Sequence, residues 1–209
     1  MKLLVTGGAG VVGTTVARML LDAGHEVGVI ADLSRNDGGQ TPAEILTPGA
    51  GFEAVFHFAG LVTGAESMAH PEWRWDNSTR AELALLDAMA EAEVSKLVFS
   101  SICTGYEANK LAIDSAIAAY CRVGGLGAIS LRYFDFDSDC PADDTGPHDY
   151  LDLTDLARAH LLALDTIQPG VQEIYNLGTV RCTPETVDIS EIVSGAWELP
   201  QLTAEQSIG

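Results

Sequence analysis

The sequence predicts an α/β fold in which a doubly wound parallel sheet is wrapped by helices. Short apolar runs alternate with helical patterns along the 209 residues, and this alternation favours a parallel sheet because crossover helices must cover both of its faces. A glycine-rich loop separates the first apolar run from the first helical pattern. The length suits one compact domain, with at most a small appendage.

The first elements follow one another closely. Residues 2–6 (KLLVT) predict a buried strand, and the glycines after it lead into a helix over residues 11–23. Residues 25–30 (HEVGVI) predict a second strand. Residues 34–51 are polar and rich in glycine and proline, so we expect a connection there with one helical turn at residues 42–46.

The middle of the chain predicts two strands and two helices. Residues 53–58 (EAVFHF) and 96–101 (KLVFSS) are apolar runs of strand length. Between them, residues 77–92 place leucines and alanines on one stripe at helical spacing, which predicts a helix packed on the sheet. Residues 106–123 predict a long helix that follows the second of these strands.

The last part continues the alternation. We expect strands at residues 127–132 (GAISLR) and near residues 173–176, with a helix over residues 153–164 between them. A short helix is expected near residues 188–195. An acidic loop separates the first of these strands from the helix.

The charge balance and the cysteine content narrow the function classes. The formal net charge is −19, with 30 acidic residues against 11 lysines and arginines, and such a surface repels nucleic acid. The four cysteines include no Cys-x-x-Cys pair, which is typical of reduced thiols in a cytosolic protein. No run reaches the roughly 18 apolar residues of a membrane span, and we expect no signal peptide. These observations predict a cytoplasmic protein without nucleic-acid or membrane partners.

The glycine loop carries the first functional prediction. Gly7, Gly10 and Gly13 are spaced as G-x-x-G-x-x-G between the first predicted strand and helix. In this context the first glycine allows a tight turn, the second lets backbone approach a pyrophosphate, and the third lets the helix pack closely on the strand. Because the helix N-terminus presents free N–H groups, it binds an anion locally even in an acidic chain. The loop therefore predicts a Rossmann-like dinucleotide site.

An acidic residue at the end of the second strand is expected to hold the adenosine ribose. Asp32 lies there, 19 residues after Gly13. Arg35 is close by and would instead suit a 2′-phosphate, so NADP stays open as the alternative to NAD.

Tyr106 and Lys110 are the candidate catalytic pair. They lie four residues apart on one face of a predicted helix. A neighbouring cation lowers the pKa of a phenol, so Tyr106 would exchange a hydroxyl proton near neutral pH. An exposed helix pair has the same spacing, but Thr104 and Glu107 form a capping-box pattern that begins the helix just before Tyr106. This position favours the catalytic interpretation.

Taken in order, these residues and the segments around them resemble the extended short-chain dehydrogenase/reductase family, the NAD-dependent epimerases and dehydratases. Within it, the likeness is greatest to the UDP-glucose 4-epimerases, which are isomerases of galactose metabolism. The segments that carry the resemblance include MKLLVTGGAGVVG, FEAVFHFAGLV, KLVFSS, ISLRYFD, DYLDLTDLARAH and EIYNLG. It covers nearly the whole chain, with large internal gaps.

The resemblance implies roles for individual residues. The cofactor pyrophosphate would be bound by Gly7, Gly10, Val11, Val12 and Gly13. The nicotinamide side would be lined by Phe58, Ala59, Gly60 and Asn77, with Phe134 nearby. Tyr106 and Lys110 would be catalytic: the phenolate takes the proton of the sugar 4-hydroxyl as a hydride passes to NAD and later returns to the other face of the sugar.

The chain also departs from the family pattern. Ile102 stands where the family has a catalytic Ser or Thr, so we take the neighbouring Ser101 as the candidate hydroxyl. Ala31 occupies the position of the ribose-binding aspartate, one residue before Asp32. Most of the sugar-binding lobe is missing, which leaves residues 1–178 as the dinucleotide-binding domain and residues 179–209 as a remnant of the lobe.

Three functions therefore stay open from the sequence. The first is an NAD-dependent nucleotide-sugar 4-epimerase with a nucleotide sugar as its substrate. The second is an NAD(P)-binding protein of the same fold whose catalysis is impaired, and the third is an NAD(P)-dependent reductase of a smaller substrate. The resemblance also implies a homodimer through helices 77–92 and 106–123, although their periodic apolar residues fit a core face equally well.

Metal binding is not expected. The five histidines show no ligand spacing, and His57 and His160 fit core positions on a strand and a helix. Asp135, Asp137 and Asp139 begin like a calcium loop, but the glycine and the glutamate that such a loop needs are missing.

Overall fold

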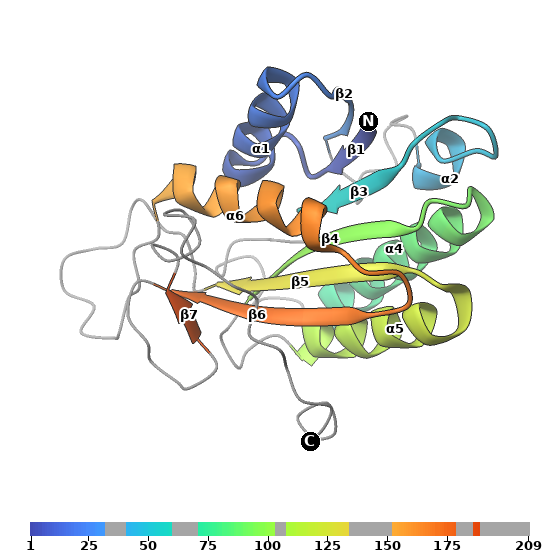
Figure 1. Ribbon diagram of the computed structural model, residues 1–209. Helices are drawn as coiled ribbons and strands as arrows, with labels where there is room; N and C mark the ends of the chain where they lie inside the picture. The colour runs from blue at the N-terminus through green and yellow to red at the C-terminus, as the bar shows by residue number, and fades with distance from the viewer. Residues whose placement is uncertain (32–40, 60–70, 103–107, 134–151, 179–185, 189–209) are drawn as a thin grey trace.

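A single parallel sheet organises the molecule. The computed structural model describes residues 1–31, 41–59, 71–102, 108–133, 152–178 and 186–188 (Figure 1). Within these residues the strands run in the order β2-β1-β3-β4-β5-β6-β7, and every neighbouring pair is parallel. The strands are β1 (Lys2–Thr6), β2 (Glu26–Ile30), β3 (Ala54–His57), β4 (Lys96–Ile102), β5 (Gly127–Tyr133), β6 (Gln172–Gly178) and β7 (Thr186–Asp188).

Helices cover both faces of the sheet, as a parallel sheet requires. They are α1 (Val11–Asp22), α2 (Pro42–Ile45), α4 (Pro71–Glu91), α5 (Ala108–Gly124) and α6 (Leu153–Thr166). Figure 1 shows α1 and α6 above the sheet and α4 and α5 below it. This arrangement confirms the predicted doubly wound fold.

Alternation along the strands divides the core into two clusters. Leu3 and Val5 of β1 pack with α1 and α6, whereas Leu4 between them packs with α4 and α5. Successive side chains of a strand point to opposite faces, so a buried parallel strand is apolar on both sides. That is why KLLVT reads as a continuous apolar run and was predictable as a strand.

The predicted elements are confirmed, with corrections at their ends. Helix α4 begins at Pro71 rather than at residue 77. The helix expected near residues 188–195 is wrong at its start, because Asp188 ends β7 and pairs with Gly178 of β6; residues 189–195 lie outside the described residues. The polar connection after β2 contributes the short helix α2 and no strand within its described part.

His160 is a core histidine, as the sequence predicts. Its ring on α6 is fully buried beside Phe58 and Tyr133, and its Nδ1 lies 2.8 Å from the carbonyl oxygen of Leu156. Since a carbonyl only accepts, Nδ1 carries the ring proton. Burial lowers the pKa of His160 to about 4. The folded protein therefore keeps this ring neutral at a pH where the unfolded chain, with a pKa of about 6.5, binds a proton.

This difference predicts acid sensitivity. The unfolded state binds more protons between about pH 6.5 and pH 4, so stability falls as the pH drops through that window. The variant His160→Asn keeps a hydrogen-bond donor for Leu156 but does not titrate. When the pH is lowered from 7 to 5, the free energy of unfolding should fall by about 2 kcal/mol more in the wild type than in this variant. Urea unfolding at the two pH values measures this, and equal losses in both proteins would contradict it.

Candidate functional site

The candidate site lies where the order of the strands reverses. The chain passes from β1 to β2 on one side and then crosses to β3 on the other side of β1. Ligands of open α/β sheets bind outside the carboxyl ends of the strands at such a point, because the two connections leave in opposite directions. Thr6 and His57 end β1 and β3 side by side in register. The segments that follow them therefore form the walls of the site.

The turn after β1 touches the segment after β3. Gly7 has a φ of +71°, a conformation that glycine adopts without strain. A Cβ on Gly7 would lie 2.5 Å from the backbone nitrogen of Ala59 and 2.6 Å from the carbonyl carbon of Phe58. Only glycine permits this approach, so the predicted role of Gly7 in a tight turn is matched by the geometry.

Helix α1 packs on the same turn. A Cβ on Gly13 would lie 2.4 Å from the carbonyl oxygen of Gly7. There is therefore no room for a side chain between this part of α1 and the turn. The Gly10 N–H donates to the Gly7 carbonyl at 3.0 Å, and the Thr14 hydroxyl donates to the Gly8 carbonyl at 2.7 Å. These bonds fix the turn relative to the first turn of α1.

The N-terminus of α1 is open to an anion. Its N-cap is Gly10, which provides no side-chain cap, and the first turn contains no acidic residue. Val11 is 62% exposed, while Val12 and Gly13 behind it are buried. Unpaired N–H groups and the helix dipole together attract negative charge. The turn and helix thus fit the pyrophosphate of a dinucleotide.

The strand ends beside the turn are buried and polar. Thr6 Oγ1 and His57 Nδ1 lie 2.7 Å apart, and Ser100 of β4 is hydrogen-bonded to the Tyr133 hydroxyl of β5. Phe58 is buried, and its ring packs against His160 in the core. Its backbone, together with that of Ala59, is what reaches the glycine turn.

The sequence also predicts site residues on β4 and α5. Ser101 is buried near the end of β4, where its register partner is Arg132 of β5. Its hydroxyl has no hydrogen-bond partner among the described residues. Lys110 lies in the first turn of α5, one helical turn before Asp114 on the same face.

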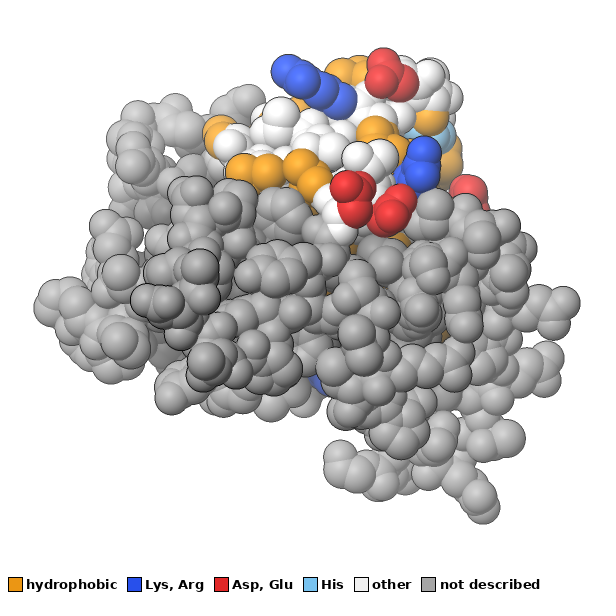
Figure 2. Space-filling view, turned by 90° about the vertical axis from the view of Figure 1, so that its left-hand side faces the viewer, with side chains coloured by type: hydrophobic (Ala, Val, Ile, Leu, Met, Phe, Trp, Pro, Cys, Tyr) orange, Lys and Arg blue, Asp and Glu red, His pale blue; other side chains and the backbone are white. Residues whose placement is uncertain are grey.

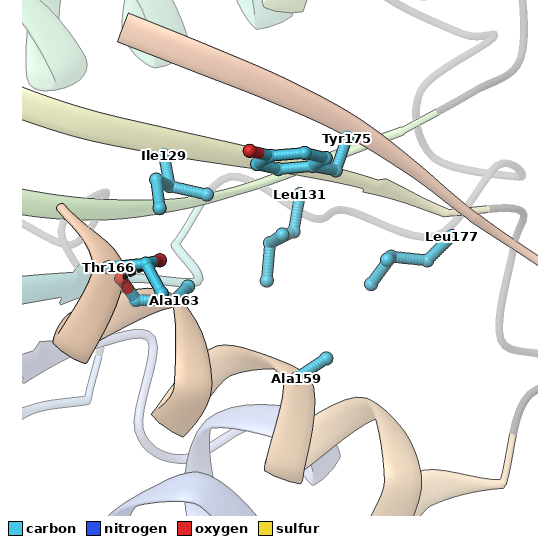
Figure 3. Close-up of a pocket in the computed structure, with 7 residues that line it drawn as sticks. All are labelled: Ile129, Leu131, Ala159, Ala163, Thr166, Tyr175 and Leu177. Carbon is cyan, nitrogen blue, oxygen red and sulfur yellow. Dashed lines mark hydrogen bonds between the residues drawn. The ribbon is translucent and has the colours of Figure 1, made fainter. Parts of the chain in front are cut away.

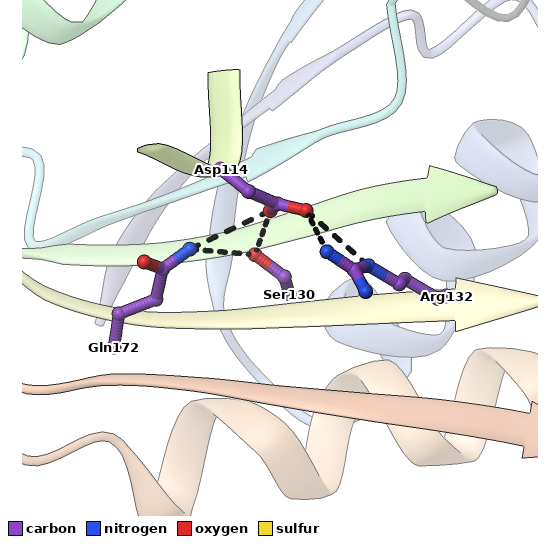
Figure 4. A network of polar contacts seen from close by, with 4 residues as sticks. All are labelled: Asp114, Ser130, Arg132 and Gln172. Atoms are coloured by element: carbon purple, nitrogen blue, oxygen red, sulfur yellow. Dashed lines mark hydrogen bonds and ion pairs between the residues drawn. The ribbon is translucent and has the colours of Figure 1, made fainter. Parts of the chain in front are cut away.

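Asp114, which the sequence analysis did not single out, is the centre of a polar network beside the predicted site residue Lys110 (Figure 4). Its carboxylate accepts hydrogen bonds from Ser130 Oγ at 2.8 Å and from Arg132 Nη2 at 2.6 Å, and Gln172 of β6 joins the network. The network ties α5 to β5 and β6 one turn below the position of Lys110. Its signal in the sequence was an acidic residue on the otherwise apolar stripe of the helix.

Other predicted residues are placed in part. Asn77 and Lys110 are located by their helices α4 and α5. The predicted residues outside the described part of the chain are Asp32, Gly60, Tyr106 and Phe134.

The remaining surface offers no second site of comparable chemistry within the described residues. A small pocket between α6 and the strands β5 and β6 is apolar apart from two hydroxyl groups (Figure 3). Its lining consists of Ile129, Leu131, Ala159, Ala163, Thr166, Tyr175 and Leu177. Burial raises the pKa of the Tyr175 hydroxyl, which keeps it protonated. Viewed from the side at which β5 and β6 end, the visible described side chains mix acidic, basic and hydrophobic types (Figure 2).

Metal, membrane and thiol chemistry have no visible basis in the described part of the chain. It contains no cluster of His, Cys, Asp and Glu suited to a metal ion, and none of its helices has the length and apolarity needed to span a bilayer. Cys121 of α5 is buried, and burial raises the pKa of its thiol to about 11. A thiol with that pKa is not a nucleophile at neutral pH.

Comparisons with known proteins identify the family. Residues 3–104 match the NAD dependent epimerase/dehydratase family. The UDP-glucose 4-epimerase of Corynebacterium glutamicum is 34% identical over 249 residues, which cover 86% of this chain and 75% of the relative. The UDP-glucose 4-epimerase of Streptomyces lividans is 32% identical over 263 residues, covering 89% and 80%.

A solved structure shares the fold. The crystal structure of the Thermus thermophilus UDP-glucose 4-epimerase in complex with NAD superposes with a TM-score of 0.67 at 25% identity, covering 85% of this chain and 78% of that chain. The alignments with the two curated relatives span 249 and 263 residues, more than the 209 of this chain. The relatives therefore contain internal stretches that this chain lacks.

The close approach at Gly13 is testable by stability. Gly13→Ala should cost about 1–3 kcal/mol, because an added methyl group is forced against backbone. Gly124→Ala is the matched control: nothing lies within 4 Å of a Cβ at this glycine of α5, so that variant should be neutral or stabilised by up to about 1 kcal/mol. Urea unfolding compares them, and equal effects would show that Gly13 is not in close contact with the turn.

The Asp114 network is testable by a double-mutant cycle. Alanine at Asp114, at Arg132 and at both should give a coupling energy of about 1–3 kcal/mol, since one partner alone leaves a charge in a half-buried setting. The exposed pair Asp155–Arg158, 3.3 Å apart on α6, is the control and should couple by no more than about 0.5 kcal/mol. Similar coupling in both pairs would mean that the network does not hold α5.

Proposed function

This chain belongs to the NAD-dependent epimerase/dehydratase family, and we propose that it is an NAD-dependent nucleotide-sugar 4-epimerase of the UDP-glucose/UDP-galactose type. The observation that carries the proposal is the open N-terminus of α1, held by Gly7 and Gly13 at the reversal point of the sheet. It gains support from 34% identity to a UDP-glucose 4-epimerase along most of both chains.

The cofactor is held by the turn after β1. Gly7, Gly10, Val11, Val12 and Gly13 form the turn and helix start that would hold the pyrophosphate. Free N–H groups of the first turn of α1 would donate to it, in place of the missing side-chain cap. Asp32 holds the adenosine ribose, and Phe58, Ala59, Gly60, Asn77 and Phe134 border the nicotinamide. When bound, NAD would reversibly accept a hydride from the sugar carbon that bears the 4-hydroxyl.

Tyr106 moves the proton. Its phenolate takes the proton of the sugar 4-hydroxyl and returns it after the keto sugar has turned over in the site. Lys110 lies one turn along the helix and lowers the pKa of the phenol by its positive charge. Asp114 and Arg132 hold the next turn of α5 against the sheet, so they fix the position from which Lys110 acts. Ser101 is the hydroxyl proposed to assist at the end of β4.

The wider setting follows from the same proposal. The partner is a nucleotide sugar, the compartment is the cytoplasm, and the role is in galactose metabolism. Residues 1–178 bind the dinucleotide and residues 179–209 are what remains of the sugar-binding lobe. A second copy of the chain packs on α4 and α5 to form a homodimer, supported by partly exposed Leu83 and exposed Val123 on these helices.

The test is a direct assay of UDP-glucose and UDP-galactose interconversion. Tyr106→Phe should lower kcat by about 10²–10⁴-fold, because it removes the proton acceptor. Tyr120→Phe is the control: the Tyr120 hydroxyl donates to Asp87, and this hydrogen bond raises the pKa of Tyr120 to about 12, so it cannot serve as a base. A Tyr106→Phe protein as active as the wild type would contradict the proposal.

The same assay separates the alternatives. A protein that carries a dinucleotide but interconverts no sugar would be a binding protein with impaired catalysis, and net consumption of NAD(P)H would indicate a reductase of a smaller substrate. Mass spectrometry of ligand released from the denatured protein distinguishes NAD from NADP. NAD is expected; NADP would indicate that Arg35 meets the 2′-phosphate at the ribose site.

A further inference from the structure

A buried pair of titratable side chains, Glu82 and His57, lies at the end of β3 next to the glycine turn. Glu82 of α4 is 3% exposed and His57 of β3 is 1% exposed. The glutamate Oε1 and the histidine Nε2 are 3.7 Å apart, at ion-pair distance. Charged side chains are seldom fully buried unless they are paired, so this contact needs a physical reason.

The pair connects to the glycine turn through one more residue. His57 Nδ1 lies 2.7 Å from Thr6 Oγ1. Thr6 is the last residue of β1, next to Gly7, and His57 is the last residue of β3, next to Phe58. A hydrogen-bonded and ionic chain therefore runs from α4 through β3 to β1. It ends at the two segments whose backbones meet at Gly7.

The apolar surroundings of Glu82 indicate that the Glu82–His57–Thr6 contacts have a specific role beyond packing. Leu85, Leu86 and Met89, the apolar residues that follow Glu82 on α4, are all buried in one hydrophobic cluster. An apolar side chain at position 82 would therefore match its neighbours. Burying a charged pair in place of apolar groups generally adds no stability. What a buried pair does add is a defined orientation of the groups it joins.

Glu82 fixes the orientation of the His57 ring. The Glu82 carboxyl group faces Nε2 at 3.7 Å, and a carboxylate there favours the ring tautomer with its proton on Nε2, because a carboxylate only accepts. Nδ1 then accepts from the Thr6 hydroxyl when the ring is neutral and donates to it when the ring is charged, so the bond to Thr6 persists in either state. The ring is also stacked on Phe99, with centroids 5.5 Å apart and planes 5° from parallel. With its plane stacked on Phe99, its Nδ1 bonded to Thr6 and its Nε2 facing the Glu82 carboxylate, the ring holds the ends of β1 and β3 at one separation.

We propose that Glu82 is a positioning residue of the dinucleotide site, which acts through His57 and Thr6 to hold the Gly7 turn against the end of β3. This inference rests on the proposed function for the identity of the ligand, NAD. The positioning itself is a property of the protein alone and is measurable without NAD.

The first measurement is amide hydrogen exchange of the turn in the free protein. The Gly8 N–H donates to the Ile30 carbonyl and the Gly10 N–H to the Gly7 carbonyl, so exchange of these amides reports opening of the turn. Glu82→Gln keeps the shape but removes the charge, and it should speed their exchange by about tenfold relative to the wild type. Thr6→Val removes the hydroxyl that bonds to His57, at the other end of the Glu82–His57–Thr6 contacts, and should speed the exchange of the same amides to the same extent.

Val94→Ala is the control for general loss of stability. Val94 is buried in the same cluster but lies just before β4, at the opposite end of the sheet from the glycine turn. Its truncation should lower the thermal midpoint without speeding exchange of Gly8 and Gly10 more than elsewhere. Equal exchange in Glu82→Gln and Val94→Ala, compared at matched loss of stability, would overturn the inference.

The second measurement is NAD affinity by calorimetric titration. Glu82→Gln should raise the Kd for NAD by about tenfold, with Val94→Ala unchanged. The double variant Glu82→Gln/His57→Gln should bind no more weakly than His57→Gln, because Glu82 acts through the ring. Unaltered affinity in Glu82→Gln overturns the inference. Failure of the wild type to bind NAD instead overturns the proposed function, and the exchange rates then still decide whether Glu82 holds the turn.

Discussion

The close contact of two backbones at the reversal point of the sheet governs the rest of the structure. Gly7 meets the backbone of Phe58 and Ala59, and Gly13 meets Gly7; a single methyl group at either glycine would separate them. The parallel order β2-β1-β3 brings these segments together, and the apolar alternation of β1 buries both faces of the strand that carries the turn. The N-terminus of α1 therefore lies at the reversal point of the sheet, where ligands of open α/β sheets bind.

Local and global electrostatics have opposite signs in this protein. The chain as a whole carries a net charge of −19, which acts against binding an anionic dinucleotide. Screening limits that repulsion to about 8 Å at physiological ionic strength, whereas the N–H groups at the start of α1 act in direct contact. With no acidic residue in the first turn of α1, the short-range attraction dominates at the proposed pyrophosphate site.

The sequence predicts what is local and leaves out what depends on distant partners. Strands such as KLLVT and the turn at Gly7, Gly10 and Gly13 could be predicted because their chemistry is contained in consecutive residues. Glu82, by contrast, shows its partner only when α4 packs on β3, 25 residues away in sequence from His57. Asp188 was misassigned to a helix because its strand has three residues and depends on pairing with β6 rather than on its own propensity.

The claim that the turn after β1 binds the pyrophosphate of NAD is tested most directly by amide NMR spectra recorded while NAD is added. We predict that the largest changes fall on Gly7, Gly10 and Gly13 and saturate with one NAD per chain. Saturable NAD binding that leaves these three amides unchanged, while residues elsewhere respond, would contradict the assignment of the site.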